Sequence, residues 1–277
     1  MIEIRDLRVR FGDLVAVDGL SLTVTEGLLY GLLGPNGAGK TTTLSCVAGL
    51  RTPTGGTVRV GGLDPVRQPM EVRRLLGLVP QSLALYPTLT VTDNLRIFGG
   101  LMGLSGARLR DRVAWGLALA QLDGRAGTIV DTLSGGMKRR LNLACALLHD
   151  PRLVICDEPT TGVDPQSRNH LFETIRALRE EGRTVVYTTH YMEEVEALCR
   201  RVAIVDHGRL VADAPLGELL ARAGATSHFD VTLSAAATPE QLRAALAAAG
   251  LNADVQAGRS LEDVFLELTG HALRDDA

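Results

Sequence analysis

The chain has 277 residues, of which 45% are apolar and 22% are charged, and its formal net charge at pH 7 is −3. This composition indicates a globular chain with one large domain and room for a small second one, and the dispersed basic residues exclude a nucleic-acid binding stripe. No apolar run approaches the roughly 20 residues that a membrane-spanning helix requires.

The first part of the chain is predicted to be rich in strands. Aliphatic runs bounded by glycines predict strands at residues 2–10, 15–24 and 28–33, and shorter ones at 57–60 and 75–80. The third strand leads directly into a glycine-rich loop, and the loop leads into a predicted helix at 41–50. From about residue 89 to residue 121 the pattern becomes mostly helical, which indicates an inserted helical subdomain.

The second part alternates strands and helices. A short buried strand at 153–156 ends just before Asp157-Glu158, and a strand at 184–188 ends just before His190. Between them lies a helix that Asp164 can cap and that Gly182 ends. A hairpin is predicted at 202–205 and 210–212, and a small α/β annex at 228–233, 239–249 and 261–268.

The N-terminus and the cysteines bear on location. The first residues alternate charged and aliphatic side chains and lack the order of a secretory signal, which favours a cytoplasmic protein. The cysteines are irregularly spaced without a C-x-x-C pair, so we expect small buried hydrophobes rather than metal ligands or disulfides; they are Cys46, Cys145, Cys156 and Cys199.

The glycine-rich loop fits the pattern G-x-x-x-x-G-K-[ST] between a strand and a helix. Its glycines let backbone N–H groups turn inward, and the following helix adds its positive end, so the loop is suited to hold phosphate. Lys40 would reach the β- and γ-phosphates, Thr41 would ligate Mg²⁺ and Thr42 would lie near the α-phosphate. The expected nucleotide-binding residues here are Gly34, Pro35, Asn36, Gly37, Ala38, Gly39, Lys40, Thr41 and Thr42.

Two carboxylates follow the apolar strand at 153–156. That position places them at the carboxyl edge of a parallel sheet, where the glycine-rich loop also lies. Asp157 would hold Mg²⁺ through its water shell, and Glu158 would orient and deprotonate an attacking water. An acidic helix cap leading into Pro159 is the other interpretation of the pair.

Three more side chains are candidates by position. His190 ends a strand expected beside that of Asp157, so its imidazole could contact the γ-phosphate and the attacking water, although a lone histidine is more often a packing residue. Gln81 could ligate Mg²⁺ and sense the γ-phosphate. Phe11 could stack on adenine with Val17 packing behind it, or it could be a core aromatic at a strand end.

A second phosphate-binding motif, Leu133-Ser-Gly-Gly-Met137, is the most informative feature of the chain. One chain has little use for two such motifs on one nucleotide. The pair is explained by an ATPase whose active site is shared between two chains, with the glycine-rich loop of one facing the serine-glycine motif of the other.

Together these motifs resemble the ATP-binding subunit of the ATP-binding cassette family, over residues 11–214. The resemblance implies that Ser134 and Gly136, with Gly135 between them, act on the γ-phosphate held by the opposite subunit, and that Asp164 belongs to a loop crossing the dimer interface. It also implies roles for Gln81 as the glutamine of the loop leading to the helical subdomain, His190 as the switch histidine and Phe11 as the adenine-stacking aromatic.

Three positions depart from the common family pattern without removing a catalytic group: Met137 replaces glutamine, Val163 leucine and Cys156 an aliphatic residue. Met137 with the residues up to Leu141 resembles the branch whose permease partners are of the ABC-2 type, mostly exporters. The segment 260–270 also resembles that branch and supports the same assignment; the other interpretation is an amphipathic helix, capped by Ser260, that covers the annex core.

The expected fold class is α/β. A P-loop NTPase core carries an N-terminal antiparallel β subdomain and an inserted helical subdomain at about 86–150 within a nucleotide-binding domain at 1–223, and 224–277 form a small C-terminal α/β annex. The expected function is ATP hydrolysis, with ATP and Mg²⁺, that drives transport through a separate integral-membrane permease. Two copies would close head to tail on ATP at the cytoplasmic face of the membrane, touching the membrane only through the permease.

Two alternatives come from other classes. A cassette ATPase acting on nucleic acid or ribosomes would normally show tandem cassettes, a long coiled-coil insertion or a basic arm, and the sequence shows none of these. A P-loop kinase or GTPase would leave Leu133 to Met137 and His190 without a role, and the guanine-reading N-K-x-D motif is absent.

Overall fold

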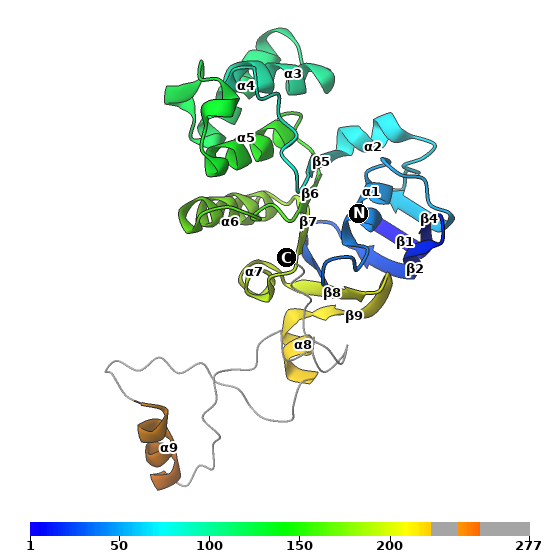
Figure 1. Cartoon of the computed structure of the whole chain (residues 1–277), viewed down its shortest axis with the longest axis vertical. Helices are drawn as coiled ribbons and strands as arrows, with labels where there is room; N and C mark the ends of the chain where they lie inside the picture. The colour runs from blue at the N-terminus through cyan, green and yellow to red at the C-terminus, as the bar shows by residue number, and fades with distance from the viewer. Residues whose placement is uncertain (223–237, 250–277) are drawn as a thin grey trace.

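Two sheets frame the chain in the computed structural model, which describes residues 1–222 and 238–249 (Figure 1). The smaller sheet is antiparallel, in the order β2-β1-β4, with β1 at Ile2–Phe11, β2 at Leu14–Val24 and β4 at Gly55–Val60. The larger, in the order β5-β6-β7-β3-β8-β9, is parallel except for the edge strand β9. Its strands are β5 (Leu76–Val79), β6 (Leu153–Asp157), β7 (Thr184–Thr189), β3 (Leu29–Leu33), β8 (Arg201–Asp206) and β9 (Arg209–Pro215).

Some of the helices lie together at one end of the molecule (Figure 1). Those that gather at one end of the molecule are α3 (Val91–Leu101), α4 (Gly106–Ala120) and α5 (Gly135–Leu147), with short 3₁₀ turns at Asp123–Arg125 and Val130–Thr132. The others are α1 (Lys40–Val47), α2 (Pro69–Leu75), α6 (Pro165–Glu180), α7 (Met192–Leu198), α8 (Leu216–Arg222) and α9 (Pro239–Ala248).

The larger sheet is covered on both faces, which explains why its strands are apolar without alternation. In β3, Leu29 and Leu33 pack into a core with α5, α6 and α7, whereas Tyr30 and Leu32 pack into a second core with α1 and the antiparallel sheet. In Figure 1, α6 and α7 lie on one side of β6 and β7, and α1 lies on the other with the smaller sheet. Strands that bury both faces cannot slide or tilt easily, so their ends are fixed points for a site.

The helical end has a core of its own. Val91 and Leu95 of α3, Val113 of α4 and Leu141 of α5 pack together there, apart from the two cores of the sheet. The deeper half of α5, with Leu143 and Leu147, packs instead against the larger sheet. Helix α5 therefore joins the helical subdomain to the sheet.

Most of the predicted architecture is confirmed, including the α/β class and the N-terminal antiparallel sheet. The strands β6, β7 and β3 are neighbours, as expected for the two carboxylates, His190 and the glycine-rich loop to meet. Helix α1 ends earlier than predicted, because Gly49 turns the chain with a φ of 67°.

Short helices were not predicted. The strand expected at 75–80 is Leu76–Val79, and Leu75 ends helix α2. Helices α2, α7 and α8 each have 7 residues, too few for a helical period to stand out. The helix expected at 239–249 is α9, which begins with a capping box between Thr238 and Gln241. The annex segments expected at 228–233 and 261–268 lie outside the described residues. The segment 260–270, which resembles the exporter branch, lies outside them as well.

Candidate active site

The glycine-rich loop joins the end of β3 to the start of α1. A Cβ at Gly34 would collide with the carbonyl oxygen of Val205, and Gly39 adopts a φ of 96° where α1 begins, so both positions require glycine. The first turn of α1 contains no acidic residue and no side-chain cap. Its N–H groups and the positive end of the helix dipole are therefore available to an anion.

Glu158 is the centre of a buried polar cluster. Its Oε1 lies 3.2 Å from Lys40 Nζ, and its Oε2 accepts a hydrogen bond from Gln81 Nε2 at 3.1 Å and lies 3.3 Å from His190 Nδ1. Glu158 and Lys40 are only 5% and 4% exposed. Three residues that are far apart in the sequence, and that are predicted to act together with Glu158, thus converge on its carboxylate.

Lys40 is held by the loop as well as by Glu158. Its ammonium group donates to the carbonyl oxygens of Gly34 at 2.7 Å and Pro35 at 3.1 Å. Burial lowers the pKa of Lys40, while the carboxylates of Glu158 and Asp157 act in the opposite direction. Because these carbonyl partners are neutral, the buried ammonium group of Lys40 is suited to bind a polyanion.

Thr188, which was not identified from the sequence, holds the carboxylate of Asp157 and the backbone of Glu158. It is paired with Asp157 across the β6–β7 register, and its hydroxyl donates to Asp157 Oδ1 at 2.6 Å. The N–H of Glu158 donates to Thr188 Oγ1 at 3.0 Å and to its carbonyl oxygen at 3.1 Å. These bonds hold Glu158 at a φ of 44°, a strained conformation for a non-glycine residue that is typical of functional sites.

The residues predicted to ligate a metal carry oxygen donors that suit a hard cation. A threonine hydroxyl, an amide and a carboxylate are available from Thr41, Gln81 and Asp157, the three predicted metal ligands. Within the described residues, no group of three or more histidine, cysteine, aspartate or glutamate side chains could hold a metal. The set fits Mg²⁺, which uses few protein ligands and completes its shell with water and substrate phosphate.

The serine-glycine motif begins helix α5. Ser134 caps the helix by accepting from the N–H of Met137 at 3.3 Å, and Gly136 lies against Asp164 and Ser167. Asp164 in turn caps α6 by accepting from the N–H of Ser167 at 2.9 Å, and this bond lowers the pKa of its carboxyl group. In the described part of the chain, neither Ser134 nor Asp164 bonds to the Glu158 cluster.

Phe11 lies at the end of β1 and is 41% exposed, so it is not a core aromatic. The guanidinium carbon of Arg51 lies 4.0 Å from its ring centroid, a cation–π contact that the sequence did not reveal. Val17 is fully buried and packs beneath Gly39 of the loop.

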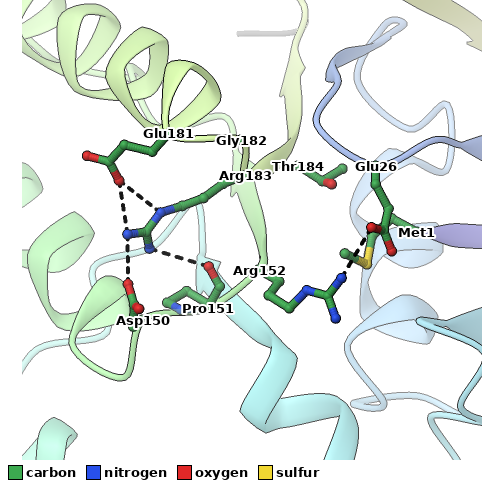
Figure 2. Close-up of a pocket in the computed structure, with 9 residues that line it drawn as sticks. All are labelled: Met1, Glu26, Asp150, Pro151, Arg152, Glu181, Gly182, Arg183 and Thr184. Carbon is green, nitrogen blue, oxygen red and sulfur yellow. Dashed lines mark hydrogen bonds and ion pairs between the residues drawn. The ribbon is translucent and has the colours of Figure 1, made fainter.

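A separate hollow of about 230 Å³ lies at the opposite, amino-terminal edge of β6 and β7 (Figure 2). Its charged side chains are already paired: Arg183 contacts Asp150 at 2.7 Å and Glu181 at 3.0 Å, and Arg152 contacts Glu26 at 3.2 Å. Ligands of such sheets bind at the carboxyl ends of the strands. The Glu158 cluster, not this hollow, is therefore the candidate active site.

Comparisons with known proteins identify the family. The family model described as ABC transporter matches residues 17–161. The chain is 41% identical to the Nod factor export ATP-binding protein I of Cupriavidus metallidurans, covering 99% of each protein. It is 44% identical to the linearmycin resistance ATP-binding protein LnrL of Bacillus subtilis, covering 84% of this chain and 75% of that protein.

Solved structures show the same fold. A structure described as the ATP-binding subunit of an ABC transporter has a TM-score of 0.77 and 27% identity, covering 97% of this chain and 99% of that one. A dimeric ATP-binding cassette bound to ADP and Pi has a TM-score of 0.71 and 26% identity, covering 78% of this chain and 99% of that one.

Proposed function

This chain belongs to the ABC transporter family, and from that premise we propose that it is the ATP-hydrolysing subunit that drives export through a separate membrane permease. The observation that carries the proposal is the convergence of Lys40, Gln81 and His190 on Glu158. The direction of transport follows from relatives that are named for Nod factor export and for resistance to linearmycin and to daunorubicin and doxorubicin.

The cluster is arranged to activate water. Lys40 now contacts Glu158 Oε1, and an arriving γ-phosphate would draw the ammonium away and leave that oxygen able to accept a proton from the attacking water. Gln81 and His190 both lie at Oε2, so they orient the carboxylate from its other side. Phosphoryl transfer needs positioning and charge neutralisation above all, and these residues supply both.

Thr41, Gln81 and Asp157 would hold Mg²⁺ in this site. When bound, the ion would neutralise charge on the β- and γ-phosphates. Thr188 keeps Asp157 in place through its 2.6 Å hydrogen bond, and Phe11 offers an exposed ring to the adenine.

Two copies of the chain would complete each site. Ser134 caps α5, and Gly135 and Gly136 begin its first turn. The N–H groups of this turn and the helix dipole would be available to the γ-phosphate of a second copy. Asp164 lies beside the motif and would cross the same interface. An ATP-binding cassette of this fold has been solved as a dimer, which supports the arrangement.

The alternative of a cassette ATPase that acts on nucleic acid or ribosomes is not favoured. Relatives that cover nearly the whole chain are named as export or resistance ATP-binding proteins. The net charge of −3 offers no general attraction to a phosphate backbone.

The permease is proposed to dock on the segment between Gln81 and Gly103. No described helix has both the length and the apolar character needed to cross a bilayer. Leu83 and Tyr86 expose 40% and 45% of their surface beside the Gln81 loop, and Tyr86 packs on Phe98 of α3. The chain would then be peripheral at the cytoplasmic face of the membrane, and the residues Met137 to Leu141 support a permease of the ABC-2 type.

The domain arrangement remains part of the proposal. Residues 1–223 would form the nucleotide-binding domain, with the helical subdomain at about 86–150, and residues 224–277 would form the annex.

The shared site is tested by Glu158→Gln. The substitution removes the base without removing a phosphate contact, so the chain should bind Mg-ATP, lose hydrolysis at least a hundredfold and accumulate as a dimer in light scattering. Lys40→Ala is the matched control and should lose ATP binding instead. A Glu158→Gln chain that stays monomeric at saturating Mg-ATP contradicts the composite site.

The docking segment is tested by crosslinking. Single cysteines at Leu83 and Tyr86, introduced into a chain without its native cysteines, should crosslink to the permease that the chain drives. Val66, which is 44% exposed, is the control position. Transport that proceeds while neither position crosslinks would rule out this docking surface.

A further inference from the structure

Arg139, on the second turn of α5, is a buried cation whose hydrogen bonds within the described residues all go to backbone carbonyl groups. It is 6% exposed, and its Nη1 donates to the carbonyl oxygens of Gln81 at 2.7 Å and Pro80 at 3.2 Å. Its Nη2 donates to the carbonyl oxygen of Thr161 at 3.3 Å. One planar group thus joins α5 to the loop that carries Gln81 and to the loop that lies between Glu158 and Asp164.

Burying Arg139 among carbonyl groups costs free energy, which indicates that the residue has a role. Burial lowers the pKa of Arg139, and the hydrogen bonds of its guanidinium within the described residues go to carbonyl oxygens rather than to a carboxylate. Burying a charge without a counter-charge costs more free energy than burying an apolar side chain of similar volume. The guanidinium is kept because its rigid fork can hold several carbonyl groups at once.

The position of Arg139 on α5 makes it a link between sites. Ser134, which caps the same helix, is five residues earlier, so motif and arginine belong to one rigid segment. One turn further on, Asn142 Oδ1 accepts from the N–H of Ala84 at 3.1 Å. Helix α5 therefore bonds to the Gln81 loop at two points, and Ser134 to Met137 lie at its N-terminus.

We propose that Arg139 is a positioning residue that couples the chain's own ATP site to the half-site it offers to the second copy. Gln81 and Glu158 act on the nucleotide of their own chain, and the Ser134 motif acts on the nucleotide opposite. Arg139 bonds the Gln81 loop and the Thr161 loop, which belong to the chain's own ATP site, to helix α5, which carries the Ser134 motif. ATP binding at the chain's own site therefore aligns the motif that faces the second copy. This inference rests on the shared site proposed above.

The test separates ATP binding from dimer closure, with Glu158→Gln as the parent chain. Adding Arg139→Ala should leave the Kd for Mg-ATP, measured on dilute monomer, within about twofold, because the glycine-rich loop is untouched. It should weaken ATP-dependent dimerisation at least tenfold. Arg139→Lys keeps the charge but cannot bond three carbonyl groups at once, so its dimerisation should lie between that of the parent and that of Arg139→Ala. The lysine variant replaces the alanine variant in the test if the latter does not fold.

Arg112→Ala is the matched control. Arg112 donates to the carbonyl oxygens of Leu148 at 2.7 Å and Leu147 at 2.8 Å, at the other end of α5. Its loss should lower the Tm but leave dimerisation intact. The proposal is overturned if both Arg139 variants dimerise like the parent, or if Arg112→Ala impairs dimerisation equally. A parent that does not dimerise refutes the shared site itself.

Discussion

At the scale of single residues, function in this chain depends on which partners hold a side chain. Glu158 was identified from its place after a strand, but its strained backbone depends on Thr188, 30 positions away, and its carboxylate contacts Lys40 in a distant part of the sequence. Thr188 could not be singled out, because a strand-end threonine is common and its importance comes from register with Asp157. Sequence patterns identify reactive groups better than the neutral groups that hold them.

Phe11 gives a prediction at this scale. Phe11→Ala should weaken Mg-ATP binding about tenfold, because stacking a base on an aromatic ring contributes about 1–3 kcal/mol. Phe11→Tyr should bind normally. Titration calorimetry on the Glu158→Gln chain measures both.

Two comparisons make this result specific to the base. Inorganic tripolyphosphate has no base, so its affinity should be the same in all these chains. Leu14→Ala removes another exposed apolar group from the same turn and should leave ATP binding unchanged. An unaltered ATP affinity in Phe11→Ala would remove Phe11 from the site.

At the scale of elements, the starts of α5 and α6 are packed without spare room. A Cβ at Gly136 would lie 2.7 Å from Ser167 Cβ and 2.9 Å from Asp164 Oδ2, closer than van der Waals contact allows. Gly136 is therefore required for packing within the chain, besides any contact with nucleotide. The sequence places both helices correctly from their capping residues, but it cannot show that their starts touch, because that contact depends on how α5 crosses the sheet.

The packing predicts a paired substitution. Gly136→Ala should lower the free energy of unfolding by about 1–3 kcal/mol through overpacking. Ser167→Gly removes the atoms in the way and costs about 1 kcal/mol alone, because glycine weakens a helix. Urea unfolding of the double variant should show a smaller loss than the sum of the two. Strict additivity would mean that the starts of the helices are not in contact.

At the scale of the whole molecule, the cores enclose every cysteine. Cys46, Cys145, Cys156 and Cys199 are free and buried, which confirms the interpretation of their irregular spacing. Burial raises the pKa of the Cys46 thiol to about 11 and that of Cys156 to about 12. Cys46 and Cys156 lie on opposite faces of the larger sheet and Cys145 in the helical core, so together they report on each core.

The rate of thiol labelling should therefore depend on unfolding of the described cores rather than on pH. At pH 8 a thiol of pKa about 11 is ionised to about one part in a thousand, and no reagent reaches it in the folded chain. Ellman's reagent should detect no thiol in native protein and all four after guanidinium is added. Raising the pH from 8 to 9 should leave native labelling slow, because the raised pKa keeps the thiols protonated and access still requires opening. One thiol that reacts quickly in native protein would show that its core opens independently of the others.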